Sequence, residues 1–332
     1  MRKMASVRKV TDVQPIPSAD RIEKVSVGGW DVVSQKGDFE VGDLCVYFEV
    51  DSLMPSDERW AFLESNSTPK TIEGKEHSGH VLKTMKLRGQ LSQGLALPIE
   101  MFDGHENFAE GNDLTDELGI VKYEVPIPSE ISGVVLGKRP HYVPMTDAER
   151  IQNLEEDLSY LANYAWACSE KVDGTSVSFF IEDGEFGVAG RNYVQAPNNK
   201  TVYWQIAEEY DIESLLGEFV PHSGRVALQG EIYGPKIQSN PLKVSRPSLA
   251  CFRLMLNGRD ITITEDFPLA PSVDVPFPVT VAEGLAAADN YVSQINPDAV
   301  AEGLVWRCLN GNDLSREQRC IKAISNQYLL KQ

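Results

Sequence analysis

Glu170-Lys171-Val172-Asp173-Gly174-Thr175-Ser176 lies near the middle of a chain of 332 residues, between two segments of different periodicity. Ahead of it, residues 147–164 carry apolar side chains three or four apart behind the possible N-cap Thr146, which predicts an amphipathic helix. After it, apolar and polar residues alternate over 176–181 and 186–190 around the turn 182–185, which predicts a β-hairpin. The stretch therefore marks the entry of the chain into a sheet.

The segments further along extend that sheet. Residues 202–216 have a helical pattern, and residues 225–233 have a strand pattern. Two more strands are expected at 250–256 and 303–309, each followed by an Asn-Gly turn, which is a strong hairpin signal. The second half of the chain is therefore expected to be an α+β domain dominated by antiparallel sheet.

The first half has shorter, β-rich runs. Strand patterns at 30–33, 44–50 and 94–98 are separated by turn signals such as Gly28-Gly29, where glycine reaches positive φ without strain. This spacing predicts a small all-β barrel over residues 1–105. Residues 106–145 are rich in Gly, Pro and acidic side chains, and we expect them to connect the barrel to a second domain at 146–332, as the length of the chain also favours.

The charge balance excludes binding of nucleic acid by bulk charge. The 49 acidic and 31 basic residues give a net charge of −18, so a nucleic-acid site must be a local basic patch. No apolar run approaches the roughly 20 residues of a membrane span, and no signal-peptide core is found. The five scattered cysteines lack any CxxC pair, which argues against a disulfide framework or a zinc site. We expect a cytoplasmic protein without membrane attachment.

Five polar clusters are spread over the second half. They are Lys171-Val172-Asp173-Gly174, Arg191-Asn192, Gly230-Glu231-Ile232-Tyr233-Gly234, Glu302-Gly303-Leu304-Val305-Trp306-Arg307, and Lys322. Each cluster alone is a weak signal, because a Lys-x-Asp-Gly sequence arises by chance and its plainest interpretation is a surface turn. Together, with Glu231 and Glu302 following Lys171 by 60 and 131 positions, they are much harder to explain by chance.

The cations among these residues suit nucleotidyl transfer. A lysine amine attacks the α-phosphorus of ATP only when it is deprotonated, and a neighbouring metal ion or cation can lower its pKa. Lys171 is the candidate nucleophile. Charge that builds up on the α-phosphate and on departing pyrophosphate needs fixed positive partners, which Arg191, Arg307 and Lys322 could supply.

The carboxylates suit a metal ion. Asp173, Glu231 and Glu302 offer the hard oxygens that Mg²⁺ prefers, and some of them would act through bound water. Plainer interpretations exist for each residue taken separately: Asp173 could form a turn with Gly174, Glu231 could be an edge-strand charge, and Arg307 could be a solvated strand residue. The complete set favours function.

In order and spacing, the clusters resemble the covalent nucleotidyltransferase superfamily of ATP-dependent ligases and capping enzymes. From about residue 5 to residue 331 the chain resembles more narrowly the fifth family of ATP-dependent RNA ligases. The first half is similar to the OB module of that family through residues 19–23, 41–52 and 86–94. DNA ligases and capping enzymes usually place an OB domain after the lysine motif, so the domain order favours an RNA ligase.

The resemblance implies a fold, an all-β OB barrel followed by an α+β nucleotidyltransferase domain with ATP-grasp-like antiparallel sheets. It also implies three steps: a lysyl-AMP on the enzyme, transfer of AMP to an RNA 5′-phosphate, and attack by a 3′-hydroxyl. The cofactors would be ATP and Mg²⁺ or Mn²⁺. The substrate would be a nick in an RNA-containing duplex, preferably with a ribonucleotide at the 3′-hydroxyl. No obligatory protein partner is evident, and a monomer is expected.

Site residues follow from the resemblance position by position. Lys171 would be the nucleophile, and Lys322 would act with it on the α-phosphate. Glu231 and Glu302 would serve the ribose or the metal, and Phe252 would stack on adenine. The remaining nucleotide-binding candidates are Glu170, Asp173, Gly174, Arg191, Asn192 and Arg307.

One position departs from the family pattern. Many related ligases have two lysines separated by one residue in the last motif, whereas Lys322-Ala323-Ile324 has isoleucine in the second place. The cation that covers the rest of the phosphate is therefore unassigned, with Lys331 and Arg307 as possibilities.

A small basic and polar cluster in the barrel is a candidate for binding the nucleic-acid backbone, as OB domains do. A solvated strand face explains it almost as well. Its members are Lys83, Lys86, Arg88, Gln90 and Gln93.

Three alternatives remain open from sequence. A DNA ligase is the nearest, because the chemistry is the same. A capping-type guanylyltransferase shares the lysine chemistry but uses GTP. A noncatalytic RNA-binding protein would rest on the barrel alone, and it is disfavoured because the lysine, carboxylates and arginines are all present.

Overall fold

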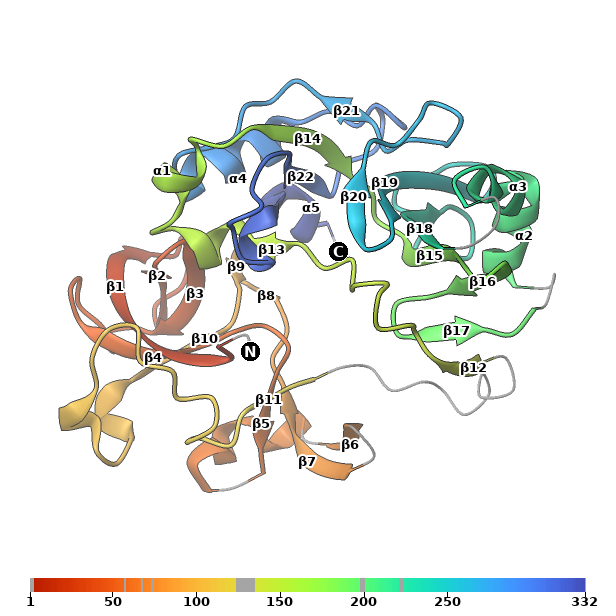
Figure 1. Cartoon of the computed structure of the whole chain (residues 1–332). Coiled ribbons are helices and arrows are strands. Elements are labelled where there is room, and N and C mark those ends of the chain that lie inside the picture. Colours follow the sequence, from red (N-terminus) through yellow and green to blue (C-terminus); the bar gives the residue numbers. More distant parts are fainter. Residues whose placement is uncertain are drawn as a thin grey trace. The chain divides into compact units, whose positions relative to one another are not determined.

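The chain divides into two compact units, residues 1–127 and residues 128–331. The computed structural model describes residues 3–56, 58–66, 68–72, 75–123, 135–197, 201–220 and 224–331. Figure 1 colours the first unit from red to yellow and the second from green to blue. The division falls within the segment 106–145 that was expected to connect two domains.

The main sheet of the first unit has the antiparallel order β10-β4-β1-β2-β3. Its edge strands β10 and β3 also contact each other, so the sheet curls on itself as expected for a barrel. The strands are β1 (Ala5–Pro15), β2 (Ile22–Val27), β3 (Trp30–Gln35), β4 (Leu44–Phe48) and β10 (Leu95–Pro98).

Strand β4 has an uninterrupted apolar sequence because both of its faces are buried. Cys45 and Tyr47 pack with Trp30 in one core, and Val46 and Phe48 pack in another core on the opposite face. The second core also takes Leu114, Leu118 and Ile120. Part of the expected connector therefore belongs to the core of the first unit.

The rest of the first unit consists of short elements. A second sheet has the order β11-β5-β7-β6, and β8 and β9 form a separate hairpin. The bounds are β5 (Ser52–Pro55), β6 (Thr68–Ile72), β7 (Lys75–Val81), β8 (Met85–Leu87), β9 (Gln90–Ser92) and β11 (Val121–Lys122), with the 3-10 helices η1 (Glu58–Asn66), η2 (Ile99–Met101) and η3 (His105–Asn107).

The larger sheet of the second unit has the antiparallel order β12-β17-β16-β15-β18-β19-β20. Asp183 and Gly184 adopt φ of 51° and 85° between β15 and β16, which confirms the expected tight hairpin. Asn257 and Gly258 do the same between β19 and β20. The strands are β12 (Val135–Lys138), β15 (Thr175–Glu182), β16 (Glu185–Ala189), β17 (Tyr193–Gln195), β18 (Arg225–Tyr233), β19 (Ser248–Leu256) and β20 (Arg259–Ile261).

Two short helices, α2 (Val202–Glu209) and α3 (Ile212–Gly217), cover one face of this sheet through Ile206, Ile212 and Leu216. The helical pattern expected over 202–216 is divided between these two helices, because Asp211 has φ of 47° and interrupts a continuous helix. No helix of the described segments is both long and apolar enough to cross a bilayer.

The smaller sheet has the order β13-β23-β22-β14-β21, with only β13 and β23 parallel. Helix α4 begins at Thr280, whose hydroxyl accepts a hydrogen bond from Glu283 N at 3.2 Å, and it packs on this sheet. The elements are β13 (Glu149–Arg150), β14 (Trp166–Lys171), β21 (Ser272–Val273), β22 (Gly303–Cys308), β23 (Cys320–Ile324), α1 (Leu158–Leu161), α4 (Val281–Asn290), α5 (Asn326–Leu329), η5 (Ile151–Leu154) and η6 (Glu317–Arg319).

The amphipathic helix expected over 147–164 was wrong. Glu149 and Arg150 pair with β23, so the segment starts as a strand and only Leu158–Leu161 is α-helical. Thr146 is no N-cap, since its hydroxyl donates to Ser176 Oγ at 3.1 Å. The apolar spacing instead places Ile151, Leu158 and Leu161 in the core below the smaller sheet.

The stretch 170–176 connects the two sheets of the second unit. Strand β14 ends at Lys171 in the smaller sheet, and β15 begins at Thr175 in the larger one. Gly174 makes this crossover possible, because a Cβ there would lie 2.2 Å from the Ile232 carbonyl oxygen. Residues at the crossover therefore face side chains from both sheets.

Candidate active site

A cavity of about 200 Å³ lies at the crossover, entirely within the second unit. Both sheets line it, through the end of β14, the start of β15, and strands β18, β19, β22 and β23. It brings together most of the candidate site residues, namely Glu170, Lys171, Asp173, Gly174, Arg191, Glu231, Phe252, Arg307 and Lys322.

The Lys171 ammonium forms an ion pair with Glu302, with Nζ 2.7 Å from Oε1. Burial opposes the charge on the amine, but the carboxylates of Glu302, Glu231 and Asp173 outweigh it and raise the pKa of Lys171 above its ordinary value. In the absence of ligands the amine is therefore protonated and cannot act as a nucleophile. Glu302 does not line the cavity itself, but it contacts the residue at its centre.

The other two carboxylates each have a hydroxyl partner. Ser176 donates to Glu231 Oε2 at 3.2 Å, and Tyr328 on α5 donates to Asp173 Oδ2. Burial raises the pKa of Glu231 to about 7, with Glu302 adding to the rise and Lys171 opposing it. Burial also raises the pKa of Asp173, against the bond from Tyr328. The raised pKa values mean that the carboxyl groups of Glu231 and Asp173 ionise less readily than usual, and a bound cation would favour their ionised forms.

Lys322 points into the same cavity from β23, where it pairs with Val305 of β22. Burial, together with the positive charges of Lys171 and Arg150, lowers its pKa to about 8. Two lysines thus share one cavity and repel each other. An anion between them would relieve this repulsion.

The carboxylates fit a metal ion, although they do not form a ready-made cluster. No group of three or more acidic, His or Cys side chains at metal-binding distance is found among the described residues. Each carboxylate has another partner: Lys171 forms an ion pair with Glu302, Ser176 donates to Glu231 and Tyr328 donates to Asp173. Glu302 Oε2 is nevertheless buried without a hydrogen-bond partner in the part of the chain that is described, which leaves an oxygen suited to a cation.

Arg191 forms a bidentate contact with Asp147, with Nη1–Oδ1 and Nη2–Oδ2 both at 3.0 Å. Both residues line the cavity. Asn192 does not line it; its carbonyl accepts a hydrogen bond from Arg139 N. The candidate pair Arg191-Asn192 is therefore divided, with only the arginine facing the cavity.

Phe252 and Arg307 form a stacked pair at the other side of the cavity. The guanidinium carbon of Arg307 lies 4.4 Å from the centre of the Phe252 ring, a cation–π contact. Arg307 Nε is buried and has no hydrogen-bond partner among the residues described. The pair presents an aromatic surface and a cation to the same space.

The Glu170 carboxylate is fully occupied. It accepts hydrogen bonds from Tyr291 Oη at 2.9 Å, Ser293 Oγ at 2.5 Å and Gln294 N at 3.0 Å. These contacts fix the residue that precedes Lys171. The carboxylate therefore positions the end of β14, and the Glu170 backbone stays a candidate for contact with a ligand.

Several residues that shape the cavity could not be recognised from the sequence. Asp147 and Thr146 lie in a segment whose apolar spacing predicted a helix, and Tyr328 is 155 residues from Asp173, its partner. Ser176 was within the opening stretch, but nothing local marked its bond to Glu231. Such contacts become visible only once the strands are paired.

The candidate nucleic-acid cluster of the first unit lies at the β8–β9 hairpin. Lys83, Lys86 and Arg88 are exposed and Gln90 is half-buried. Gln93 is a correction: it is buried, and its carbonyl accepts a hydrogen bond from Tyr47 Oη at 2.7 Å. It therefore serves the barrel core and not the surface.

Comparison with known families divides the chain in the same way. Residues 4–99 match the family described as OB-fold domain, and residues 165–324 match the family described as RNA ligase. The RNA ligase of Naegleria gruberi, solved as a Lys→Met mutant with AMP and Mn, is 33% identical, with a TM-score of 0.82, and the match covers 100% of this chain and 99% of that one. The chain belongs to the RNA ligase family.

Other solved forms of the Naegleria gruberi ligase are equally similar in sequence. A Lys→Ala mutant with ATP and Mn is 33% identical over 99% of both chains with a TM-score of 0.82, and a form with PPi has a TM-score of 0.79 at 33% identity over 100% of this chain and 99% of that one. A search of curated proteins found no match.

Family membership settles the class of enzyme. The expectation of an ATP-dependent RNA ligase that forms phosphodiester bonds, with an OB-fold domain ahead of the ligase domain, is confirmed. The second unit is the ligase domain, and its crossover cavity is the candidate site for adenylylation.

Proposed function

We propose that this RNA ligase seals 3′-hydroxyl/5′-phosphate nicks in RNA-containing duplexes through a lysyl-AMP on Lys171 and an adenylylated RNA. The observation that carries the proposal is the position of Lys171 Nζ, 2.7 Å from Glu302 and in one cavity with Glu231 and Lys322. It is a lysine amine facing both the carboxylates and the cations that the reaction needs.

In the first step the neutral amine of Lys171 attacks the α-phosphorus of ATP. A P–N bond forms, the bond to the β-phosphate oxygen breaks, and pyrophosphate leaves with the electron pair. Lys322, which shares the cavity, would offset the negative charge that builds up on the α-phosphate. Lys171 must first lose its proton, which its pairing with Glu302 opposes.

Glu302, Glu231 and Asp173 would hold Mg²⁺ or Mn²⁺. A bound cation would supply positive charge beside Lys171, which lowers the pKa of the amine and offsets the crowded carboxylates. The support comes from the unpartnered Glu302 Oε2 and from the raised pKa values of Glu231 and Asp173. The Naegleria gruberi relative with ATP and Mn supports the same pairing of ligands.

Adenine would stack on Phe252, and Arg191 would contact the ribose and phosphates. Both side chains line the cavity, and Arg191 would have to exchange Asp147 for the nucleotide. The ATP-grasp-like character of the antiparallel sheets stays a prediction.

In the second step an oxygen of the RNA 5′-phosphate attacks the α-phosphorus of lysyl-AMP. The P–N bond breaks, and the amine of Lys171 takes up a proton. In the third step the 3′-hydroxyl attacks the adenylylated 5′-phosphate and AMP leaves. The exposed Lys83, Lys86 and Arg88 at the β8–β9 hairpin of the first unit, with Gln90, would hold the nucleic-acid backbone.

The nucleophile is tested by labelling. The variant Lys171→Ala should not become labelled by α-labelled ATP, whereas Lys36→Ala, which removes an exposed lysine of the first unit, should label as the unaltered protein does. Undiminished labelling of Lys171→Ala would show that Lys171 is not the nucleophile. Labelling by GTP in place of ATP would favour a capping-type guanylyltransferase.

The substrate is tested with two nicked duplexes that differ only in the sugar at the 3′-hydroxyl. We expect the duplex with ribose to be sealed at least tenfold faster than the duplex with deoxyribose. Equal rates would replace the RNA-specific proposal by a general nick-sealing activity, including that of a DNA ligase.

A further inference from the structure

A second cavity, of about 400 Å³, adjoins the first within the same unit. The two cavities share Thr146, Asp147, Phe252 and Arg307 in their linings. The larger one is rich in arginine, with Arg253, Arg307, Arg316 and Arg319 around it. It therefore continues the nucleotide cavity into a more basic space.

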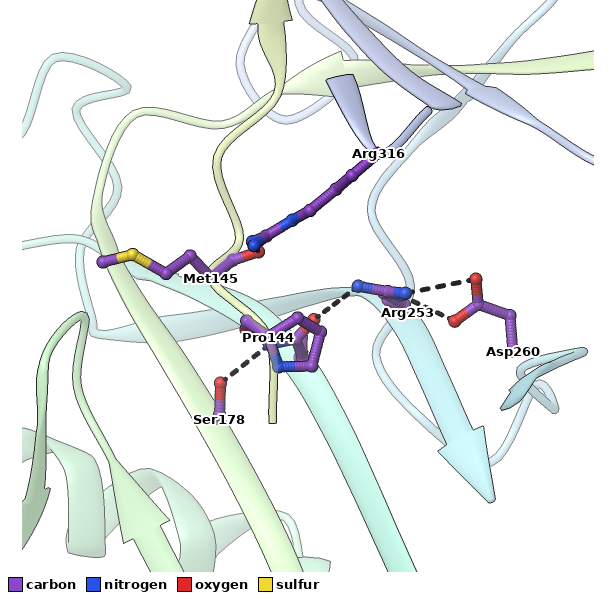
Figure 2. A network of polar contacts seen from close by, with 7 residues as sticks. Pro144, Met145, Ser178, Arg253, Asp260 and Arg316 are labelled. Carbon is purple, nitrogen blue, oxygen red and sulfur yellow. Dashed lines mark hydrogen bonds and ion pairs between the residues drawn. The ribbon is translucent and has the colours of Figure 1, made fainter. Parts of the chain in front are cut away.

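The arginines of this larger cavity have partners of different kinds. Arg253 forms a bidentate contact with Asp260 at 2.7 and 3.2 Å, and Figure 2 shows this pair pointing toward each other. Arg319 donates to the carbonyls of Leu314 and Asn312. Arg316 likewise has a neutral acceptor, since its Nη2 donates to the Met145 carbonyl at 2.8 Å (Figure 2). Its charge is thus not offset by that contact.

Arg139 is the residue that follows β12. Its backbone N donates to the Asn192 carbonyl at 3.1 Å, which places it beside Arg191 at the ends of β12 and β17. Burial and the nearby charges of Arg316 and Arg191 lower the pKa of Arg139, while Asp147 opposes this. Arg139, Arg191 and Arg316 are here called the arginine cluster; Arg191 is paired with Asp147, and the charges of Arg316, Asp147 and Arg191 all act on Arg139.

Such a local excess of positive charge is unexpected in a chain with a net charge of −18. Guanidinium groups whose charges act on one another repel, and a further anion would relieve this repulsion. A planar guanidinium presents paired N–H donors that match phosphate oxygens. The observations point to a phosphate group as the missing anion.

The segment that carries Asp147 is held in place. Gln229, fully buried, donates to the Pro144 carbonyl at 2.7 Å and to Ser178 Oγ at 3.1 Å, the contacts drawn around Pro144 and Ser178 in Figure 2. Arg316 holds Met145, and Thr146 holds Ser176. The cluster is thus positioned before any ligand arrives, as a phosphate site requires.

We propose that Arg316 and Arg139, with Arg191 once it leaves Asp147, bind a phosphate group next to the nucleotide cavity. The inference rests on the proposed function for the identity of the ligand. It also accounts for Ile324: the position that is a second lysine in many related ligases is here a buried isoleucine, and the arginine cluster supplies positive charge from segments outside the strands.

Two sources could provide this phosphate. One is the β,γ-diphosphate of ATP, which leaves as pyrophosphate; the other is the 5′-phosphate of the RNA, which attacks the same phosphorus in the next step. In an in-line displacement the leaving group of the first step and the attacking group of the second both lie opposite Lys171. The same cluster could therefore meet either group, and the experiment must separate them.

The variants are Arg316→Gln and Arg139→Gln. Arg316→Lys keeps the charge at position 316, and Arg259→Gln is the control. Arg259 is exposed on β20 and lines neither cavity, so its loss removes one positive charge without touching the site. The first arm measures binding of inorganic pyrophosphate to the full chain by calorimetry. The second arm starts from isolated lysyl-AMP enzyme and measures transfer of AMP to a 5′-phosphorylated nick in a single turnover.

We expect Arg316→Gln and Arg139→Gln to lose at least tenfold in one of the arms, and Arg316→Lys to recover most of that loss. Weaker pyrophosphate binding identifies the ATP tail, and slower AMP transfer at unchanged pyrophosphate binding identifies the RNA end. Sealing of pre-adenylylated RNA, in which the 5′-phosphate is already joined to AMP and neither pyrophosphate nor a free 5′-phosphate takes part, should stay within twofold.

Changes below twofold in both arms, relative to Arg259→Gln, would overturn the assignment. So would an equal loss in the sealing of pre-adenylylated RNA, because that indicates general damage. Pyrophosphate binding needs no chemistry at Lys171, so it tests the cluster even if Lys171→Ala were to disprove the proposed function.

Discussion

Lys171 Nζ lies 2.7 Å from Glu302 Oε1, so the candidate nucleophile of this RNA ligase is stored as an ion pair. The pair stabilises the ammonium form, because three carboxylates raise the pKa of the amine against the effect of burial. The ligand-free site is thus an inactive form of the nucleophile. Activation requires that something else take over the carboxylate.

The first prediction concerns the reactivity of Lys171 without nucleotide. Its amine should react slowly with an acylating reagent at pH 8, and Mn²⁺ should raise the rate several-fold by competing for Glu302. In Glu302→Gln the amine should react faster without metal, and the response to Mn²⁺ should be much smaller. Mass-spectrometric competitive labelling of Lys171, with Lys36 as the internal reference, measures both. An unaltered rate in Glu302→Gln would show that the ion pair does not control the amine.

The second prediction concerns stability. Burial on folding raises the pKa of Glu231 from its ordinary value of 4.5 to about 7. Between these values the folded protein binds more protons than the unfolded one, so this group makes the protein less stable as the pH rises through that window. Removing the charge with Glu231→Gln should therefore stabilise the ligand-free protein at pH 8, by roughly 1 to 3 kcal/mol, and should have little effect at pH 4.

Urea unfolding at the two pH values tests this, with Glu185→Gln, an exposed residue of β16, as the control. The control should change the free energy of unfolding equally little at both. A Glu231→Gln variant that is less stable at pH 8 would mean that the bond from Ser176 and the attraction to Lys171 outweigh burial. Adenylylation by the same variant should fall, because the carboxylate serves the ligands and not the fold.

The third prediction concerns Tyr328, which ties α5 to the Asp173 carboxylate. The bond favours the ionised form, so Tyr328→Phe should raise the pKa of Asp173 further. The acidic limb of the pH profile for lysyl-AMP formation should move up by about 0.5 to 1 pH unit. Tyr160→Phe, which loses an exposed contact with Tyr164, should leave the profile unchanged. A uniform loss of rate without a shifted limb would contradict the assignment.

The sequence was sufficient for features encoded locally. The β18 bounds, the Asp183-Gly184 and Asn257-Gly258 turns, and the entry into the larger sheet all follow from alternation and turn chemistry over a few residues. Polar clusters that are far apart in sequence also contribute to one cavity. They could be grouped beforehand because their residue types suit one reaction. What the residue types could not give was the partner of each side chain.

Long-range pairing explains what was missed. The apolar spacing of 147–164 is real, yet Arg150 pairs with Lys322 across the smaller sheet and prevents a continuous helix. That same pairing places Asp147 against Arg191, a contact between residues 44 apart that no local pattern records. The carboxylates were identified by type, but their pairing with Lys171 and Tyr328 depends on strand order.

The fourth prediction concerns Gly174, whose place in the motif has a steric reason. A Cβ would lie 2.2 Å from the Ile232 carbonyl oxygen, and that backbone belongs to β18 and cannot move away freely. Gly174→Ala should destabilise the protein by roughly 1 to 3 kcal/mol and displace the crossover that carries Lys171. Gly217→Ala, at the end of α3 with open space around it, should be neutral or slightly stabilising. Equal urea midpoints for the two variants would refute the steric account.

The last prediction concerns the β8–β9 hairpin of the OB-fold unit. Lys86 and Arg88 are exposed there, and Arg88 has φ of 52°, so Arg88→Asn removes the charge while keeping a residue that tolerates this backbone. If both side chains contact phosphates, Lys86→Ala and Arg88→Asn should each reduce the slope of log Kd against log salt by about 0.7 to 0.9 for a nicked RNA duplex. Labelling by ATP should be unaffected, because the adenylylation cavity is lined wholly by the other unit. Lys36→Ala serves as the charge-matched control. An unchanged slope in both variants would show that neither Lys86 nor Arg88 contacts a phosphate, and the RNA-binding surface would then be expected on the ligase domain.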